Sequence, residues 1–134
     1  MSQGTLPPEQ NRSTSFDLAQ ALDNMDGDRE LFQELVTVFL EESAQRITEL
    51  REGIRNADAG LAEKAAHTIK GTVGNFAAPR AFERAFQLEV LAREKRLSEL
   101  PQAFAELEQE LDLLRDALLE AAAQVLGSRS GKSA

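Results

Sequence analysis

The sequence predicts an all-α fold, an antiparallel up-down four-helix bundle with a short extra N-terminal helix. The chain lacks Trp and Tyr and is rich in Ala, Leu, Glu and Arg, a composition typical of helical proteins. Its apolar residues recur at three- and four-residue spacing over several long segments, as one face of a helix requires. Short polar breaks separate these segments, so successive helices are expected to lie antiparallel as neighbours.

Length and composition restrict the classes of function. The chain has 134 residues, enough for one domain with a real core. The absence of Cys excludes disulfides and thiolate metal sites, and a single His excludes the paired Glu-x-x-His sites of di-iron bundles. A net charge of −8 argues against nucleic acid as a partner. No run of 18 apolar residues occurs, and no apolar segment follows Met1, so a soluble, cytoplasmic protein without a membrane span is expected.

The first two helices are expected after a polar lead. Residues 1–14 contain Pro7-Pro8 and show no periodicity, which predicts a disordered segment. Ser15 is the candidate N-cap of a short helix from about Phe16 to Asn24. A turn at Asp26–Asp28 then precedes a long helix over 29–55. The apolar face of this long helix contains Phe32, Leu35, Phe39, Ser43, Ile47, Leu50 and Ile54.

The next helix contains the only histidine. Asp58 is a natural N-cap for the segment 61–76, LAEKAAHTIKGTVGNF. On a helical wheel the core stripe consists of Ala62, Ala65, Ile69, Val73 and Phe76. His67 lies roughly 160° from Ile69, so its imidazole is expected to point away from the core. Lys64, Gly71 and Gly74 share this outer side.

Two other interpretations of this segment are possible. A lone His is most often a satisfied core or surface residue, and Lys70-Gly71 resembles a helix end. The apolar stripe, however, continues in phase past Gly71, and the first convincing stop is Gly74-Asn75, with Pro79 just beyond. A continuous helix through Gly71 is therefore expected.

Two more helices complete the bundle. The segment 80–96 is broadly apolar and contains Phe82, Ala85, Phe86, Leu88, Val90 and Leu91. The last helix is expected from Ser98 to about Val125, with its apolar residues in alternating steps of four and three, as in shallow-angle bundle packing. These residues are Leu100, Phe104, Leu107, Leu111, Leu114, Leu118, Ala121 and Val125. The bundle domain is thus predicted over 15–126, followed by a flexible tail over 127–134.

The sequence HTIKGTVGNF resembles the signature of histidine-containing phosphotransfer (HPt) domains. That signature has His, any residue, an aliphatic residue, Lys-Gly and two small residues. The matching positions are His67, Ile69, Lys70, Gly71 and Thr72. Val73 departs from the usual Ala or Ser, and Ala77 from the usual Gly. The flanking pattern from about Phe16 to Val125 also resembles the family, and the resemblance implies the same four-helix architecture.

The resemblance also implies a function and roles for individual residues. His67 would carry a phosphoryl group, because an imidazole is a good neutral nucleophile near neutral pH. Lys70, and with less support Lys64, would place an ammonium near the phosphoryl oxygens. By family spacing, Glu89 on the following helix would accept the Nδ1–H of the ring, with Gln87 as the fallback.

The chain itself would form only half of an active site. It has no P-loop, no G-x-G-x-x-G and no obvious acidic triplet for Mg²⁺, so no cofactor of its own is expected. The resemblance implies that a response-regulator receiver domain, or a hybrid histidine kinase, supplies the Asp and the Mg²⁺. Gly71 and Gly74 would leave bare backbone for such a partner, and the chain is expected to be a monomer.

Some alternatives remain open at this stage. Leu18, Leu22 and Met25 either extend the docking patch beside His67 or simply cap the end of the bundle. The chain could also be the phospho-accepting domain of a larger chemotaxis-type kinase. A structural adaptor bundle with an incidental His67 is the third possibility, although it has no use for His, Lys and Gly gathered opposite the core stripe.

Overall fold

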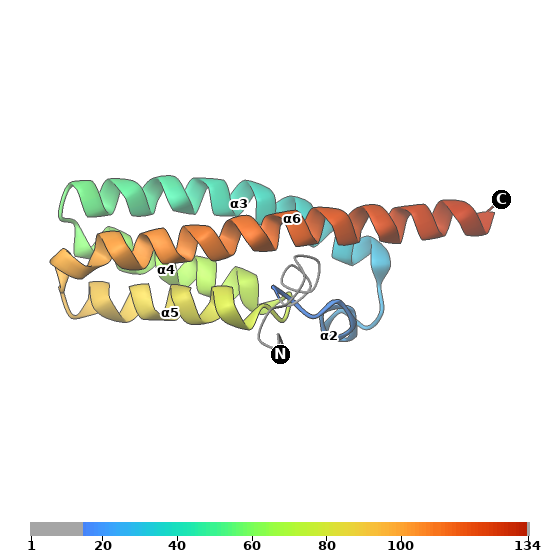
Figure 1. The fold of residues 1–134 in the computed structure, drawn as a ribbon, viewed down its shortest axis with the longest axis horizontal. Coiled ribbons are helices and arrows are strands. Elements are labelled where there is room, and N and C mark those ends of the chain that lie inside the picture. The colour runs from blue at the N-terminus through green and yellow to red at the C-terminus, as the bar shows by residue number, and fades with distance from the viewer. Residues whose placement is uncertain (1–14, 134) are drawn as a thin grey trace, which may run out of the picture.

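A computed structural model describes residues 15–133, with side chains over 15–125, so the predicted disordered lead over 1–14 lies outside the described residues. The helices are α2 (Leu18–Asn24), α3 (Arg29–Arg55), α4 (Ala59–Gly74), α5 (Pro79–Arg93), a 3₁₀ turn η1 (Leu97–Glu99) and α6 (Leu100–Ser133). The four long helices form an antiparallel bundle, and α2 lies at one end of it (Figure 1). This is the predicted fold.

Aspartate side chains begin three of the helices. Asp17, Asp28 and Asp58 each accept a hydrogen bond from the backbone N–H three residues later, which satisfies one of the free donors of a first turn. The prediction for Asp58 is confirmed. The prediction that Ser15 caps the first helix is wrong, because α2 begins only at Leu18 with Asp17 as its N-cap. The backbone N–H of Asp17 donates to the carbonyl of Ala77. Ser15 is buried instead.

After three of the helices a residue other than glycine adopts a left-handed conformation. The chain leaves α3, α4 and α5 through Ala57, Ala77 and Lys95, whose φ angles are 55°, 54° and 59°. These are left-handed conformations that cost an L-residue with a Cβ about 1 kcal/mol or more. Helix α4 continues through Gly71 and ends at Gly74, as predicted.

The core lies between all four long helices and is closed by aromatic rings at the α2 end. The ring of Phe76 packs edge-to-face on Phe32 and Phe39, with centroids 6.0 and 5.8 Å apart, and Phe16 stacks on Phe32 at 6.4 Å. The predicted stripe of the histidine helix is fully buried. The predicted seam of the last helix is also buried, apart from the partly exposed Phe104.

The structure decides one open alternative and corrects three other expectations. Met25 is buried and Leu18 and Leu22 pack against the core, so these side chains close the end of the bundle. Helix α5 ends at Arg93, three residues early, where Lys95 reverses the chain. Leu97–Glu99 forms a 3₁₀ turn before α6. Finally, the backbone of α6 remains helical to Ser133 and projects past the bundle (Figure 1), because the tail contains no Pro and its two glycines weaken a helix without ending it.

Two further findings apply to the described part of the chain. No helix there is long and apolar enough to span a membrane. Within the same residues, no three His, Asp or Glu side chains are grouped as ligands for a metal ion.

Candidate functional site

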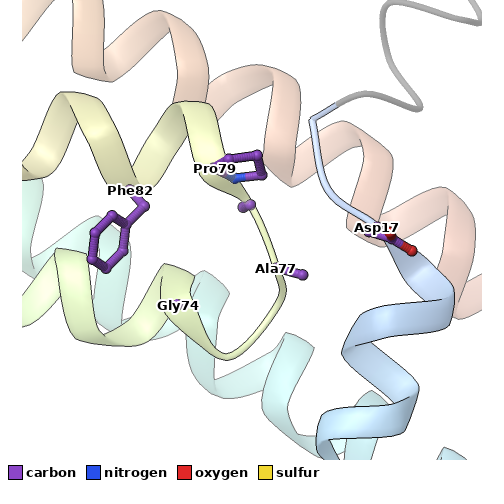
Figure 2. A pocket seen from close by; sticks show the side chains of 6 residues that line it. Asp17, Gly74, Ala77, Pro79 and Phe82 are labelled. Carbon is purple, nitrogen blue, oxygen red and sulfur yellow. The ribbon is translucent and has the colours of Figure 1, made fainter.

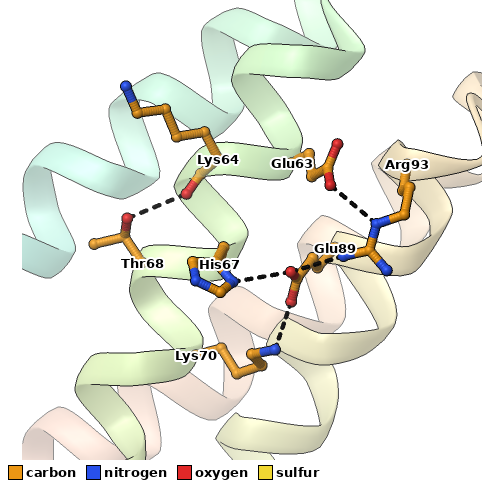
Figure 3. A network of polar contacts seen from close by, with 7 residues as sticks. All are labelled: Glu63, Lys64, His67, Thr68, Lys70, Glu89 and Arg93. Atoms are coloured by element: carbon orange, nitrogen blue, oxygen red, sulfur yellow. Dashed lines mark hydrogen bonds and ion pairs between the residues drawn. The ribbon is translucent and has the colours of Figure 1, made fainter.

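His67 lies on α4 at the side that faces α5. Its side chain is 67% exposed, yet the ring is held in place, because Nδ1 lies 2.9 Å from Oε2 of Glu89 on α5 (Figure 3). The Glu89 side chain is only 5% exposed. An exposed imidazole is therefore fixed at one nitrogen by a buried carboxylate.

This contact determines which ring nitrogen is free. An ionised carboxylate can only accept hydrogen bonds, so Nδ1 of His67 must be the protonated nitrogen that donates to Glu89. In a neutral imidazole the other nitrogen, Nε2, then carries a lone pair. The arrangement leaves a nucleophilic nitrogen on the exposed side of the ring.

Lys70, one turn after His67, contacts the same carboxylate. Its Nζ forms an ion pair with Oε1 of Glu89 at 2.8 Å. The ammonium also lies 5.2 Å from the centroid of the Phe86 ring and 6.0 Å from that of Phe82, within the range of cation–π attraction. The Lys70 side chain is only 21% exposed, so most of it is covered by these neighbours.

Glu89 remains ionised despite its burial. Burial is the largest influence and by itself would raise the pKa of this carboxyl, but the contacts from Lys70 and His67 outweigh it. The pKa of Glu89 is consequently lowered from its ordinary value of 4.5. At neutral pH the group is a carboxylate that can hold both neighbours.

Arg93, at the end of α5, is a third partner of Glu89. Its Nη2 donates to Oε2 at 2.9 Å, the same oxygen that His67 contacts. Its Nε donates to Oε2 of Glu63 on α4 at 3.0 Å. The guanidinium thus joins the two helices beside the histidine (Figure 3).

A partly apolar surface continues from His67 towards the loop between α4 and α5. We call it the α4–α5 face and define it by Gly71, Gly74, Phe82 and Phe86. Phe82 and Phe86 are 41% and 43% exposed, although aromatic residues of α5 were expected in an apolar helix face. A Cβ added at Gly71 would meet no atom within 4 Å. The face adjoins a pocket of about 420 Å³ lined by Asp17, Gly74, Ala77, Ala78, Pro79 and Phe82 (Figure 2).

The structure thus brings together three of the residues singled out in the sequence, His67, Lys70 and Glu89. The Lys64 side chain points away from this group (Figure 3). Gln87 is exposed and accepts a hydrogen bond from Arg84 on its own helix, so it is not the partner of the ring.

Sequence reasoning missed Glu63, Arg93 and the exposure of the two phenylalanines. Glu63 precedes His67 by four residues and Arg93 follows Glu89 by four. Because helix residues four apart are neighbours, Glu63 could have been placed beside His67. Arg93 could likewise have been placed beside Glu89, once Glu89 was taken as the partner of the ring.

Comparison with known proteins assigns the family. The family model described as the Hpt domain matches residues 34–117, more than half of the chain and the part that contains the site. Comparison with curated proteins gives no match. A solved structure of histidine-containing phosphotransfer protein B (HptB) from Pseudomonas aeruginosa PAO1 is similar in fold, with a TM-score of 0.77 and 21% identity, over 82% of this chain and 96% of that one. The chain belongs to the Hpt family, the histidine phosphotransfer domains of phosphorelays.

Proposed function

We propose that His67 carries the phosphoryl group on Nε2 and exchanges it with an aspartate of a receiver domain. One observation supports this most directly. The ring is 67% exposed, while its Nδ1 lies 2.9 Å from a carboxylate that is almost fully buried. Such a contact directs the Nε2 lone pair outwards and keeps the ring from turning, which supplies the alignment that phosphoryl transfer needs.

The chemical step is a displacement at phosphorus. The Nε2 lone pair of His67 forms an N–P bond while the P–O bond of the aspartyl phosphate breaks, and the bonding electrons remain on the carboxylate oxygen of the aspartate. The ring retains the proton on Nδ1 and becomes cationic. Glu89 faces that positive charge directly, so it stabilises the ring as the charge develops. Return of the phosphoryl group to an aspartate is the reverse reaction.

Lys70 is the group proposed to contact the phosphoryl oxygens. Its ammonium lies next to Glu89, one turn along α4 from His67. Charge-assisted contacts of this kind stabilise the transferring group, since phosphoryl transfer depends mostly on positioning and electrostatics. Lys64 remains a weaker candidate for the same role.

The chain is proposed to act as a phosphocarrier rather than a complete enzyme. A response-regulator receiver domain, or a hybrid histidine kinase that contains one, would supply the aspartate and the Mg²⁺. A monomer in the cytoplasm remains the expectation. The alternative of a larger chemotaxis-type kinase places the same His67 chemistry in a different protein context and predicts phosphorylation by an ATP-binding kinase domain.

The α4–α5 face is the proposed contact surface for the receiver. It begins beside His67, combines exposed aromatic rings with bare glycine backbone, and continues into the pocket lined by Phe82 and Pro79. Apolar surface of this kind, bordered by polar residues, commonly marks a protein–protein contact. A partner that docks here would cover the imidazole and exclude water during transfer.

Transfer of label from a receiver domain tests the proposal. A receiver charged with radiolabelled acetyl phosphate should pass label to the chain, and the product should be acid-labile and base-stable. Because His67 is the only histidine, His67→Gln should abolish labelling and leave helicity unchanged. Label that survives this substitution would refute His67 as the acceptor. An absence of transfer from every receiver tested, with labelling by a kinase and ATP, would favour the kinase-domain alternative.

A further inference from the structure

The carboxylate of Glu89 has more partners than the orientation of one histidine requires. His67 and Arg93 share Oε2, and Lys70 occupies Oε1. In the proposed function Lys70 moves to the phosphoryl group, so Glu89 loses its contact at Oε1 at the moment when the ring becomes cationic. A buried carboxylate that loses one of its cationic partners is held less firmly in its ionised form, and a protonated Glu89 would hold His67 poorly.

Arg93 is placed to prevent this loss. It keeps its contact with Oε2 whether or not Lys70 remains, because it reaches Glu89 from the other side, one turn further along α5. Its Nε is held at the same time by Glu63, on the turn of α4 before His67. Nε and Nη2 belong to one planar group, so fixing Nε also fixes the direction of Nη2.

The charges support this arrangement. Glu63 and Glu89 are balanced by Lys70 and Arg93 while His67 is neutral. When Lys70 turns to an incoming phosphoryl group, Arg93 and the cationic ring of His67 together balance Glu63 and Glu89. An exposed arginine that paired only with Glu63 would contribute little to stability. Here, however, the guanidinium also donates to a carboxylate that is 5% exposed and shares an oxygen with the histidine.

We propose that Arg93, anchored by Glu63, is a positioning residue that keeps Glu89 aligned with Nδ1 of His67 when Lys70 turns to the phosphoryl group. This inference rests on the proposed function of His67 and Lys70. Arg93 itself does not touch the reacting atoms. Its effect on transfer passes through the hydrogen bond between Glu89 and the ring.

The single histidine makes the test direct. The ¹⁵N spectrum of the imidazole reports which nitrogen is protonated, and all of the histidine signal comes from His67. Arg93→Gln should lower the population of the Nδ1–H tautomer in the free protein and slow transfer from a labelled receiver roughly fivefold. Arg93→Lys should be intermediate, since an ammonium restores the charge but cannot hold both carboxylates with a fixed fork. Glu63→Gln should shift the tautomer in the same direction by a smaller amount.

Arg96→Gln is the matched control. Arg96 follows closely along the chain and pairs with Glu94 and Glu99 instead of the site. This control should leave the tautomer and the transfer rate unchanged. In the free protein Lys70 still holds Glu89. Arg93→Gln should therefore shift the tautomer more in the Lys70→Ala background than in the wild type, because Glu89 then keeps only His67 as a partner.

Two results would overturn the inference. One is an unchanged tautomer in Arg93→Gln, and the other is an equal shift of the tautomer by this substitution with and without Lys70. Neither result would contradict the role of His67 as the phosphoryl acceptor. Labelling that persists in His67→Gln refutes the proposed function instead, whatever the tautomer shows.

Discussion

Gly71 separates stability from transfer more sharply than any other position in the site. It lies inside α4 with helical φ, is exposed, and has no atom within 4 Å of an added Cβ. A glycine inside a helix costs about 1 kcal/mol relative to alanine, and nothing in the fold requires that cost at residue 71. Gly71→Ala should therefore stabilise the free protein by about 1 kcal/mol, or about 3–5 °C in melting temperature.

A longer side chain at the same position should leave stability intact and slow phosphoryl transfer. Long helical side chains lean towards the N-terminus of their helix, so the glutamine of Gly71→Gln would extend over the turn that contains His67. The variant should remain at least as stable as the wild type and transfer roughly tenfold more slowly, equivalent to about 1.4 kcal/mol lost from docking. Thermal unfolding and label transfer from a charged receiver measure the two quantities.

Two controls make this result interpretable. Ala57→Gly should stabilise the protein by relieving the left-handed φ of 55° at the start of the loop before α4, without touching the proposed docking face. Its transfer rate should be that of the wild type, which separates docking from stability itself. At Gly53 an added Cβ would lie 3.0 Å from the backbone N of Ala62, so Gly53→Ala should destabilise the bundle. Stabilisation by Gly71→Gln with unchanged transfer would refute docking over this face.

Three other predictions follow from the site and the loop beside it. Lys70→Ala should slow transfer roughly tenfold and, because its ammonium is mostly covered, should also destabilise the protein by about 1 kcal/mol; an unchanged rate in label transfer would contradict its role. Because the pKa of Glu89 is lower in the folded state, its stabilisation is present above pH 4.5 and is lost as the pH falls through the lowered pKa. Urea unfolding of the wild type and Glu89→Gln should thus show a stability difference that narrows in acid, and a difference that widens would contradict this assignment. Ala77→Gly should raise the melting temperature by removing a left-handed alanine, with about 1 kcal/mol gained, whereas a loss of stability would mean that the Cβ of Ala77 makes a necessary contact.

Most of the fold follows from local patterns in the sequence. The bounds of α3 match the prediction, because a continuous apolar face, the Asp28 N-cap and the polar break at Asn56 coincide there. The ends of α5 and α6 were less predictable. Lys95 ends the helix in a left-handed conformation. A glycine at this position would have predicted the helix end, but a lysine does not. At the other end, the apolar pattern stops at Val125 and a flexible tail was predicted, but the backbone of α6 remains helical to Ser133.

The site was predictable in part. The position of His67 outside the core follows from the helical wheel, and Glu89 was suggested only by resemblance to a family. Its burial could not be read from the sequence, since an isolated Glu on a helix is almost always exposed. The exposure of Phe82 and Phe86 was not predicted either. Aromatic residues in an amphipathic helix are normally assigned to the core, and only the packing of α5 on α4 and α6 shows that these two remain outside.

Three residues close to His67 depart from simple rules of folding. Gly71 weakens its helix without a steric reason, Glu89 is a buried carboxylate, and Phe86 exposes an aromatic ring to solvent. The glycine and the exposed ring each cost the isolated bundle free energy, and the carboxylate is stable there only because cations surround it. The opposite faces of α4 and α5 follow the rules closely. Deviations that share a location and lack a structural purpose are characteristic of functional surfaces. In this bundle they lie beside the only histidine, where the proposed partner would dock over His67.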